Sequence, residues 1–372
     1  MSSPRLRRRH VLVFFYALTL GLLLLPAQDK KAASEKLTKG PVIQNVQTDR
    51  ATITWVTGKP AGAIHKAGSD DAVNVSESEY HELELTGLEA GTSYVWSLNE
   101  GGIAAKASFT TAPAKDVPFT FVVFGDTRTR HEVHRKAEER IVAEKGSFVL
   151  HTGDLVSDGL KSEDWDKFFD IEKELLSNIP FYPTPGNHER NALVYFRYFS
   201  FPGGNGHRYS FNWGSVHIAA VDTNEIGDSP QARAAFLDEE VEWLRQDLTR
   251  NKRPITFVFM HHPLYTAVES RRAHAADMAA KLEPVLVAGG VTAVFAGHDH
   301  NYQHHLKSGI HFIVTGGGGA PLYDVSPIPD ITLKALKIEN YVRVRIEGGL
   351  AKIEAFDLEG ETIDAFDLSG RK

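Results

Sequence analysis

One local pattern, an apolar run that ends in a short polar cluster, occurs four times and constrains the fold of this chain more than any other feature. The apolar runs are residues 119–124, 148–152, 255–260 and 291–296. Runs that are apolar at successive positions are typical of strands covered on both faces, as in layered α/β folds. Helical patterns occur near residues 132–145, 162–176 and 236–248. The sequence therefore predicts a sheet-and-helix domain whose polar clusters follow the carboxyl ends of buried strands.

Five polar clusters, four of them directly after these strands, are candidates for a ligand site. They are Asp126 in GDT, Asp154 in GD, Asn187 and His188 in GNHE, His261 and His262 in MHHP, and His298 and His300 in GHDH. Open α/β sheets bind ligands beyond the carboxyl ends of their strands, so clusters far apart in the sequence can meet there. Each cluster also has a structural alternative, since Asp commonly caps helices, Asn fills tight turns, and a single histidine often only packs.

Taken together, these side chains favour a metal site over separate structural roles. The chain has no cysteine, so carboxylate, amide and imidazole groups are the available ligands, and this mixture suits Zn, Mn or Fe. Two divalent ions about 3.5–4 Å apart need a bridging carboxylate, and we expect Asp154 to be that bridge. His298 and His300 are separated by one residue, so both point the same way in an extended segment. His261 and His262 are adjacent, so we expect only one of them to be a direct ligand.

Residues 41–113 show a different pattern of short alternating runs broken by turn residues. Such alternation without a helical stretch predicts a small antiparallel sandwich. Trp55 is expected in its core, and the hydroxyl of Tyr94 is expected to bond back to the backbone, as a corner tyrosine does. Trp55, the stretch LTGLEAGTSYVW (residues 85–96) and FTTAP (residues 109–113) together resemble a fibronectin type III module. We find no catalytic cluster in this region.

The order GD, GD, GNHE, HH and GHxH resembles the calcineurin-like metallophosphoesterase superfamily. With the preceding module, the resemblance is to the purple-acid-phosphatase-like branch and covers about residues 41–356. It implies an α/β (α+β) fold, a four-layer αββα sandwich preceded by the all-β fibronectin type III-like sandwich. The implied domains are residues 41–113 and the catalytic residues 117–372.

The resemblance also implies roles for the clustered residues, around two metal ions that would be Fe, Zn or Mn. The first metal would be held by Asp126, Asp154 and His300, and the second by Asp154, Asn187, His261 and His298. His188 would contact the phosphate or protonate the leaving group, oriented by a neighbour such as Glu189 or another acid. His262 would line the substrate side or support the ligands from behind.

Two positions depart from the family pattern. Ser157 stands where members with the purple iron chromophore have a tyrosine, and Arg128 stands where many other members have a histidine. The first metal thus lacks its usual fourth protein ligand: either water or another side chain completes it, with His131 and His134 the nearest candidates, or it binds weakly. We expect no tyrosinate-to-iron colour. Arg128 could hold a substrate phosphate with its planar guanidinium, or it could be a surface residue.

Other glycines and histidines have simpler expected roles. Residues 316–319 are four consecutive glycines without the Lys-Ser/Thr of a nucleotide-binding loop, and we expect a flexible loop at the site rim. His217 is expected as a sheet residue. His304 and His305 are expected behind the site or on the surface, and His131 and His134 alternatively as solvated residues of a first helical turn.

The N-terminal residues indicate export. Arg5, Arg7, Arg8 and Arg9 precede an uncharged apolar run at residues 11–25, which is shorter than the roughly 20 residues that span a bilayer. We expect a signal peptide at residues 1–27, cleaved near Ala27, then a flexible lead-in at 28–40, with an uncleaved anchor as the alternative. The paired arginines are also compatible with a twin-arginine signal, and the product would be periplasmic, secreted or on the cell surface.

Charge and composition restrict the partners of the mature chain. Removal of four basic and no acidic residues changes the formal net charge from −7 to −11, which argues against nucleic acid or an anionic membrane as a partner. The sequence predicts an exported phosphomonoesterase that hydrolyses small phosphate esters by attack of a metal-bound water. The alternatives are a phosphodiesterase or nucleotidase on the same site, or a cell-surface binding protein whose metal site is vestigial.

Overall fold

The computed structural model describes residues 36–58, 62–65, 72–75, 78–100, 103–203 and 205–371. The expected signal peptide and the first part of the lead-in lie outside these residues. Among the residues described, no helix has both the length and the apolar character needed to cross a membrane.

A six-stranded sheet carries three of the five polar clusters. Its order is β10-β9-β8-β18-β19-β20. The bounds are β8 Phe119–Phe124, β9 Val149–His151, β10 Phe181–Pro183, β18 Asn340–Glu347, β19 Leu350–Asp357 and β20 Thr362–Ser369. Strands β8, β9 and β10 are parallel, and β18 to β20 continue the sheet as antiparallel strands. The carboxyl ends of β8, β9 and β10 therefore lie side by side.

A seven-stranded sheet carries the two histidine clusters. Its order is β11-β12-β13-β14-β16-β15-β17. The bounds are β11 Tyr209–Trp213, β12 Val216–Val221, β13 Ile255–Met260, β14 Ala293–Ala296, β15 Tyr302–Lys307, β16 Ile310–Thr315 and β17 Thr332–Leu336. Strands β12, β13, β14 and β16 are parallel, so the ends of β13 and β14 are neighbours at one edge.

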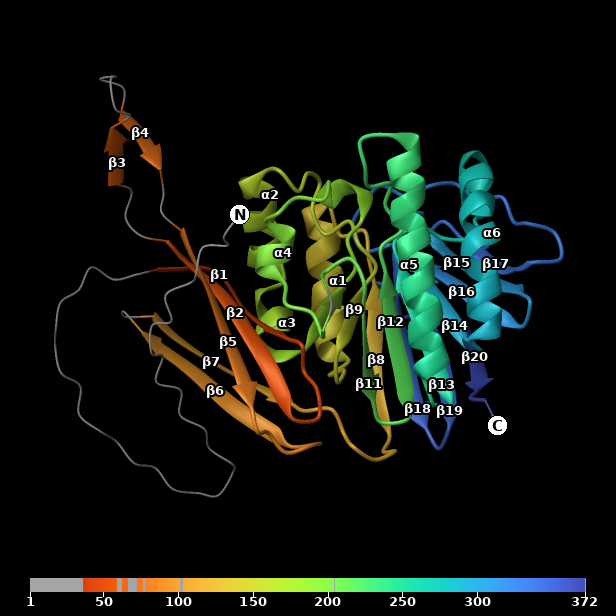
Figure 1. Cartoon of the computed structure of the whole chain (residues 1–372), viewed down its shortest axis with the longest axis horizontal. Helices are drawn as coiled ribbons and strands as arrows, with labels where there is room; N and C mark the ends of the chain where they lie inside the picture. The colour runs from red at the N-terminus through yellow and green to blue at the C-terminus, as the bar shows by residue number, and fades with distance from the viewer. Residues whose placement is uncertain are drawn as a thin grey trace.

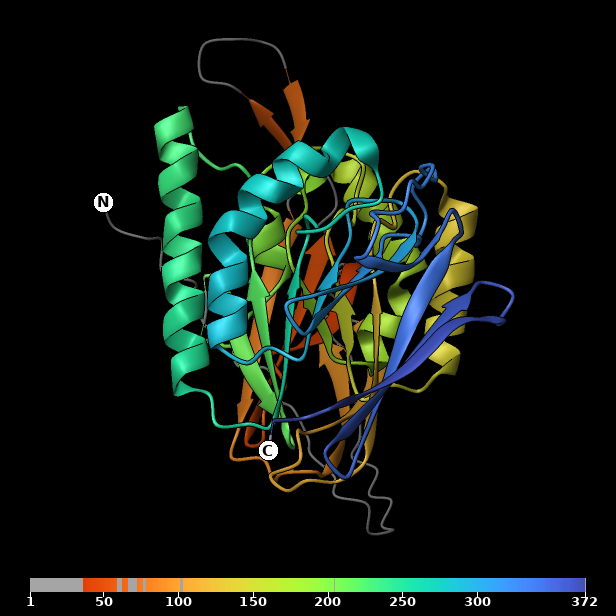
Figure 2. The same cartoon turned by 90° about the vertical axis from the view of Figure 1, so that its right-hand side faces the viewer.

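Helices cover the outer face of each sheet (Figures 1 and 2). The helices beside the six-stranded sheet are α1 His131–Ala143, α2 Ser162–Ile171, α3 Lys173–Asn178 and α4 Tyr195–Tyr198, and those beside the seven-stranded sheet are α5 Pro230–Arg250 and α6 Arg272–Ala288. This arrangement confirms the predicted four-layer αββα sandwich. The single helix expected near residues 162–176 is instead two helices that meet at the buried residue Glu172.

Both faces of the central strands are buried, as their apolar runs predict. In β8, Phe121 and Val123 pack in the core between the sheets, whereas Val122 and Phe124 pack against the helices on the other face. The rings of Phe121 and Phe257, one from each sheet, lie 5.7 Å apart. Burial of each such side chain stabilises the fold by about 1.5–3 kcal/mol, so the two sheets form one rigid support for the loops at their edge.

The N-terminal residues form a small all-β module. Antiparallel strands β1 Lys36–Gln44, β2 Arg50–Gly58 and β5 Ser78–Thr86 make one sheet, and the hairpins are β6 Ser93–Glu100 with β7 Ile103–Thr110 and β3 Gly62–His65 with β4 Ala72–Val75. Trp55 is buried, and the Tyr94 hydroxyl accepts a hydrogen bond from Glu89 N at 2.8 Å, both as predicted. Residues 36–40 belong to β1 and pair with β2, so the expected flexible lead-in does not extend to residue 40.

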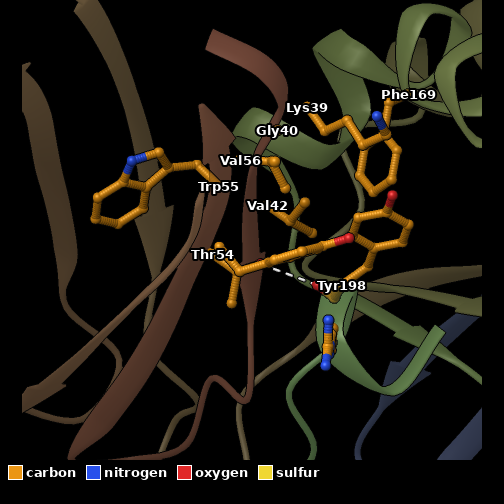
Figure 3. A pocket seen from close by; sticks show the side chains of 10 residues that line it. Lys39, Gly40, Val42, Thr54, Trp55, Val56, Phe169 and Tyr198 are labelled. Carbon is orange, nitrogen blue, oxygen red and sulfur yellow. Dashed lines mark hydrogen bonds between the residues drawn. The ribbon is translucent and has the colours of Figure 1, made fainter. Parts of the chain in front are cut away.

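The module is docked on the catalytic domain through the segment that follows the GNHE cluster. Gln44 donates to the Tyr198 carbonyl at 3.0 Å and accepts from Ser200 N at 2.5 Å. Thr54 donates to the same carbonyl at 3.0 Å, and Figure 3 shows Thr54 facing Tyr198 while Trp55 lies on the other side of the strand. The Tyr182 hydroxyl donates to Val46 O at 2.7 Å. These buried contacts fix the module to the catalytic domain through β10, which precedes the GNHE cluster, and through residues 198–200, which follow it.

His217, His304 and His305 lie within the seven-stranded sheet. His217 is buried in β12 and bonds to Asp247 at 2.7 Å, which confirms its expected sheet position. His304 and His305 lie in β15 and are buried, so the expectation of a surface position is wrong. His304 bonds to Asp364 at 2.9 Å and to His311 at 2.8 Å, and these contacts link the second sheet to strand β20 of the first.

Candidate metal centre

The five polar clusters meet where the carboxyl ends of β8, β9 and β10 face those of β13 and β14. Asp126, Asp154 and His300 offer ligand atoms that all lie within 4.8 Å of one another, and so do His261, His262 and His298. Asn187 opens a short 3-10 turn after β10 and joins the second group through His261. The structure thus brings together Asp126, Asp154, Asn187, His261, His298 and His300, the six residues to which the resemblance gives a ligand role.

One oxygen of Asp126 has no hydrogen-bond donor. Asp126 is fully buried; its Oδ2 accepts from His298 N at 2.8 Å, while its Oδ1 has no partner. That Oδ1 lies 3.4 Å from His300 Nε2. An unpaired buried carboxylate oxygen is costly, and a cation between Asp126 and His300 would satisfy it.

The ring nitrogens of two candidate ligands are oriented by backbone carbonyls. His300 Nδ1 donates to Pro321 O at 2.7 Å, and His261 Nδ1 donates to Thr152 O at 2.8 Å. A carbonyl oxygen only accepts, so in each neutral ring the proton is on Nδ1 and the lone pair is on Nε2. Metal-binding histidines are commonly fixed in this way.

The lone pair on His261 Nε2 faces three other candidate ligand atoms. His261 Nε2 lies 3.1 Å from Asn187 Oδ1, 3.4 Å from Asp154 Oδ1 and 3.2 Å from His298 Nδ1. Burial, with His262 and His261 nearby, holds the pKa of His298 far below its usual range, so this imidazole is neutral. The oxygens of Asn187 and Asp154 repel the His261 lone pair unless a positive charge lies among them, and the donor set suits Zn, Mn or Fe.

Asp154 lies between the two groups. It is a member of the first group and faces His261 of the second. Burial alone would raise the pKa of Asp154, but His261, His188 and Arg128 around it lower that pKa on balance. An ionised carboxylate in this place can serve both groups.

Three residues of the centre have a strained backbone conformation. Asp126, Asp154 and His298 have φ values of 58°, 57° and 66°, in the left-handed region that non-glycine residues seldom adopt and that clusters at functional sites. The glycines beside them are needed for space as well. A Cβ on Gly153 would lie 2.7 Å from His261 Nδ1, and one on Gly186 would lie 2.3 Å from Asp154 Oδ1.

His261 and His262 do not point to opposite sides, as an extended segment would require. Strand β13 ends at Met260, and the two rings beyond it lie with centroids 4.8 Å apart. His261 faces Asp154, whereas the His262 ring lies 4.3 Å from that of His298 and its Nδ1 lies 3.1 Å from the hydroxyl of Thr223. Both histidines therefore belong to the centre.

The side chain of Glu189 does not orient His188. Its buried carboxylate accepts from the backbone N–H groups of Asp154 and Leu155, both at 2.9 Å, and of Gly186 at 2.6 Å. It thereby holds the loops after β9 and β10 together. His188 is oriented instead by Ser157 O, 2.6 Å from its Nδ1.

The sequence left open whether Arg128 lies at the site and whether His131 or His134 is the fourth ligand of the first metal. Arg128 is not a surface residue: its Nε donates to Asp154 Oδ2 at 3.2 Å and its Nη2 to His300 Nε2 at 3.4 Å. His134 is buried in α1 and bonds to Glu172 at 2.6 Å, so it neither reaches the centre nor lies in solvent. His131 is exposed on the first turn of α1.

The four-glycine loop is packed tightly, which contradicts the expectation of a flexible rim. Residues 316–319 are buried. A Cβ on Gly316 would lie 2.7 Å from Asp126 Oδ2, and one on Gly319 would lie 2.5 Å from Thr127 O. Glycine is present here because the loop lies directly against the backbone that carries Asp126.

Two further residues support the histidines of the centre and could not be found from the sequence. The ring of Tyr323 stacks on that of His300 at 4.4 Å, and the Arg271 guanidinium lies 4.5 Å from the Tyr323 ring. Arg271 also donates to His298 O and to Asp299 Oδ1, both at 2.6 Å. Neither residue follows an apolar run or belongs to a motif, so only the fold places them here.

An αββα sandwich that gathers acids, an amide and imidazoles at one edge defines the metallophosphoesterase class. The family model of calcineurin-like phosphoesterases matches residues 119–302, so this part of the chain is similar to that family in sequence. It is 27% identical to purple acid phosphatase 18 of Arabidopsis thaliana over 68% of this chain and 62% of that protein, and 27% identical to phosphoenolpyruvate phosphatase of Allium cepa over 68% and 56%. The chain thus spans less than two thirds of the length of these relatives.

A solved structure supports the fold over most of the chain. Purple acid phosphatase PPD1 from yellow lupin (Lupinus luteus) seeds superposes with a TM-score of 0.73 and 17% sequence identity, over 88% of this chain and 74% of that one. Purple acid phosphatases are therefore relatives of this protein in sequence and in fold.

Proposed function

We propose that this protein is an exported phosphomonoesterase that hydrolyses small phosphate esters with two metal ions. The observation that carries this proposal is the set of buried acceptors around Asp154. Asp126 Oδ1 has no donor, and Asp154 Oδ1 and Asn187 Oδ1 face the lone pair of His261. Two cations on either side of Asp154 would satisfy all of them.

In this proposal the first metal is held by the first group, and the second metal by the residues whose ligand atoms surround His261 Nε2, while His262 is left to contact the phosphate. Asp126, Asp154 and His300 hold the first, and Asp154, Asn187, His261 and His298 hold the second. Metals bound here would neutralise the phosphoryl oxygens and make a water molecule more acidic. The ions would be Fe, Zn or Mn, since the ligand set excludes sulfur.

His188 is our candidate for the general acid. Its Nδ1 donates to Ser157 O, so its Nε2 is directed toward the centre, 3.9 Å from Asp154 Oδ2. The side chain is 31% exposed, which leaves it accessible to a substrate and to proton exchange with water. In the imidazolium form, in which Nε2 also carries a proton, His188 would give that Nε2 proton to the departing alkoxide and keep its bond to Ser157 O.

Arg128 and His262 are our candidates for contacts with the phosphate. The guanidinium of Arg128 reaches the ligand cluster from the loop after β8. His262 is buried next to His298, and its pKa is held well below the usual range by burial and by His261. A neutral imidazole and a cationic guanidinium can donate to different phosphoryl oxygens.

The experiment is a metal and activity assay on the purified chain. We expect two equivalents of metal by elemental analysis and hydrolysis of a chromogenic phosphate monoester, faster than that of the matching diester. Asp154→Ala should lose both metal and activity, whereas Asp170→Ala, an exposed carboxylate on α2, should retain both. Faster diester cleavage would favour a phosphodiesterase or nucleotidase. Bound metal without turnover of any phosphate ester would favour a binding protein.

Export and the domain boundaries are part of the same proposal. A signal peptide at residues 1–27 would release a chain whose module, residues 41–113, precedes the catalytic domain at 117–372. The basic residues followed by a short apolar run support export. N-terminal sequencing of the protein recovered outside the cytoplasm would test the cleavage site near Ala27.

A further inference from the structure

Arg128 is held within the group of side chains that would bind the first metal. Its Nε donates to Asp154 Oδ2 at 3.2 Å and its Nη2 donates to His300 Nε2 at 3.4 Å. The Arg128 side chain is only 15% exposed. Its positive charge therefore lies against two of the three proposed ligands of that metal.

The contact with His300 uses the electron pair that a metal would need. His300 Nδ1 donates its proton to Pro321 O at 2.7 Å, so the neutral ring has a single lone pair, on Nε2. That lone pair cannot accept from Arg128 and bind a cation at the same time. Asp154 has no such conflict, because a carboxylate oxygen offers more than one acceptor position.

Asp126, in contrast to His300, favours a bound metal ion over the Arg128 guanidinium. Its buried Oδ1 has no donor and lies 3.4 Å from His300 Nε2, so Arg128 leaves it unsatisfied. A metal ion at this place would satisfy Asp126 but would displace the guanidinium from His300, and like charges this close repel. In the second group, His261 and Asn187 face each other, and Arg128 reaches this group only through Asp154, whose carboxylate oxygens offer further acceptor positions. The lone pair of His261 is therefore not taken up by Arg128.

We propose that Arg128 is an internal competitor for the first metal, so that the two metal sites differ in affinity. The second site fills first, and the first site fills at higher metal concentration as Arg128 moves away from His300. The displaced guanidinium then becomes available to the phosphate of the substrate. This inference rests on the proposed two-metal function and adds an order of filling to it.

The test is a Mn²⁺ titration of the full chain after its metals have been removed by chelation. Calorimetry measures the two affinities, and electron paramagnetic resonance detects the spin coupling of two Mn²⁺ ions that share a bridge. In the unaltered protein we expect one tight and one weaker binding event. Arg128→Ala should tighten the weaker event by about tenfold to a hundredfold, the range expected when a hydrogen bond to a charged group is lost.

A second variant and a control complete the experiment. Arg128→His supplies an imidazole in place of the guanidinium, and the coupled Mn²⁺ signal should appear at lower metal concentration than in the unaltered protein. Arg135→Ala removes the same charge from an exposed position on α1 and should change neither event. Unchanged or weaker binding in both Arg128 variants would overturn this inference and leave the two-metal function standing. Absence of Mn²⁺ binding in every protein would overturn both.

Discussion

His188 Nδ1 lies 2.6 Å from the carbonyl oxygen of Ser157, so one backbone atom keeps a proton on Nδ1 and leaves Nε2 as the ring atom that can take up and release the proton of the proposed acid. His188→Ala should lower kcat by roughly 10²–10⁴-fold. The loss should be larger for an alkyl phosphate than for a nitrophenyl phosphate, because a good leaving group needs no proton. Metal content should not change.

A matched control for this variant is His131→Ala, because His131 is an exposed histidine on α1. It should leave both rates unaltered. Equal losses on the two substrates with His188→Ala would mean that His188 binds the phosphate and does not protonate the leaving group.

Glu189 holds the loops after β9 and β10 through its carboxylate. In the unaltered protein, backbone N–H groups donate to both carboxylate oxygens of Glu189. In Glu189→Gln, one of these oxygens is replaced by an amide N–H₂, which cannot accept from them. We expect the free energy of unfolding to fall by about 1–3 kcal/mol, the cost of unsatisfied buried groups. Urea denaturation measures this, with the exposed Glu174→Gln as control; equal stability of the two variants would contradict the role we give to Glu189.

The N-terminal module should unfold together with the catalytic domain. Gln44 bonds to both Tyr198 O and Ser200 N across the boundary. Tyr198 O also accepts from Thr54, so Gln44→Ala leaves Ser200 N without a partner and removes one of the two hydrogen bonds to Tyr198 O. We expect a loss of about 1–3 kcal/mol and a single thermal transition. Gln47→Ala is the control, since the Gln47 side chain bonds only to Asn45 within the module. Two separate transitions in the unaltered protein would show that the module is independent.

The stability of the folded protein should fall between pH 6.5 and 8. Burial raises the pKa of Glu172 to about 8, above the ordinary value of 4.5. The folded protein therefore holds a proton in this window that the unfolded chain has released, so the free energy of unfolding decreases as pH rises, by at most about 1.4 kcal/mol per unit for one proton. Burial lowers the pKa of His134 to about 3, and its opposite effect is confined to pH below 6.5.

Urea denaturation at pH 6.5 and at pH 8 tests this slope. Glu172→Gln should reduce it, and the exposed Glu174→Gln should not. Burial also raises the pKa of Glu189 to about 8 and that of Glu138 and Glu240 to about 7, and these groups account for the slope that remains in the Glu172 variant. An identical slope in the unaltered protein and in Glu172→Gln would show that Glu172 is ionised in the folded state.

The strands and the ligands of the centre could be predicted from the sequence because both have local patterns. The apolar run of β8 defines a strand buried on both faces, and Asp126 follows it directly. Residues that act across the fold carry no such pattern. Tyr323 stacks on His300 only because the loop after the four glycines crosses the centre, and nothing near Tyr323 in the sequence indicates this contact.

The predictions that were wrong, for residues 316–319 and for His134, also failed because of contacts between distant parts of the chain. A run of glycines permits flexibility, but residues 316–319 lie against Asp126 and Thr127, where a Cβ would not fit. His134 occupies a first helical turn, where solvent is the usual neighbour, yet Glu172 from the junction of α2 and α3 covers it. In both cases the tertiary contact, which the local sequence does not encode, decides the environment.

Anomalous diffraction from crystals of the metal-loaded protein, recorded at the absorption edge of the bound metal, tests the central claim most directly. The account predicts two peaks on either side of the Asp154 carboxylate, one next to Asp126 and His300 and the other next to Asn187 and His261. A single peak that does not touch Asp154, or no peak within this cluster, would contradict it.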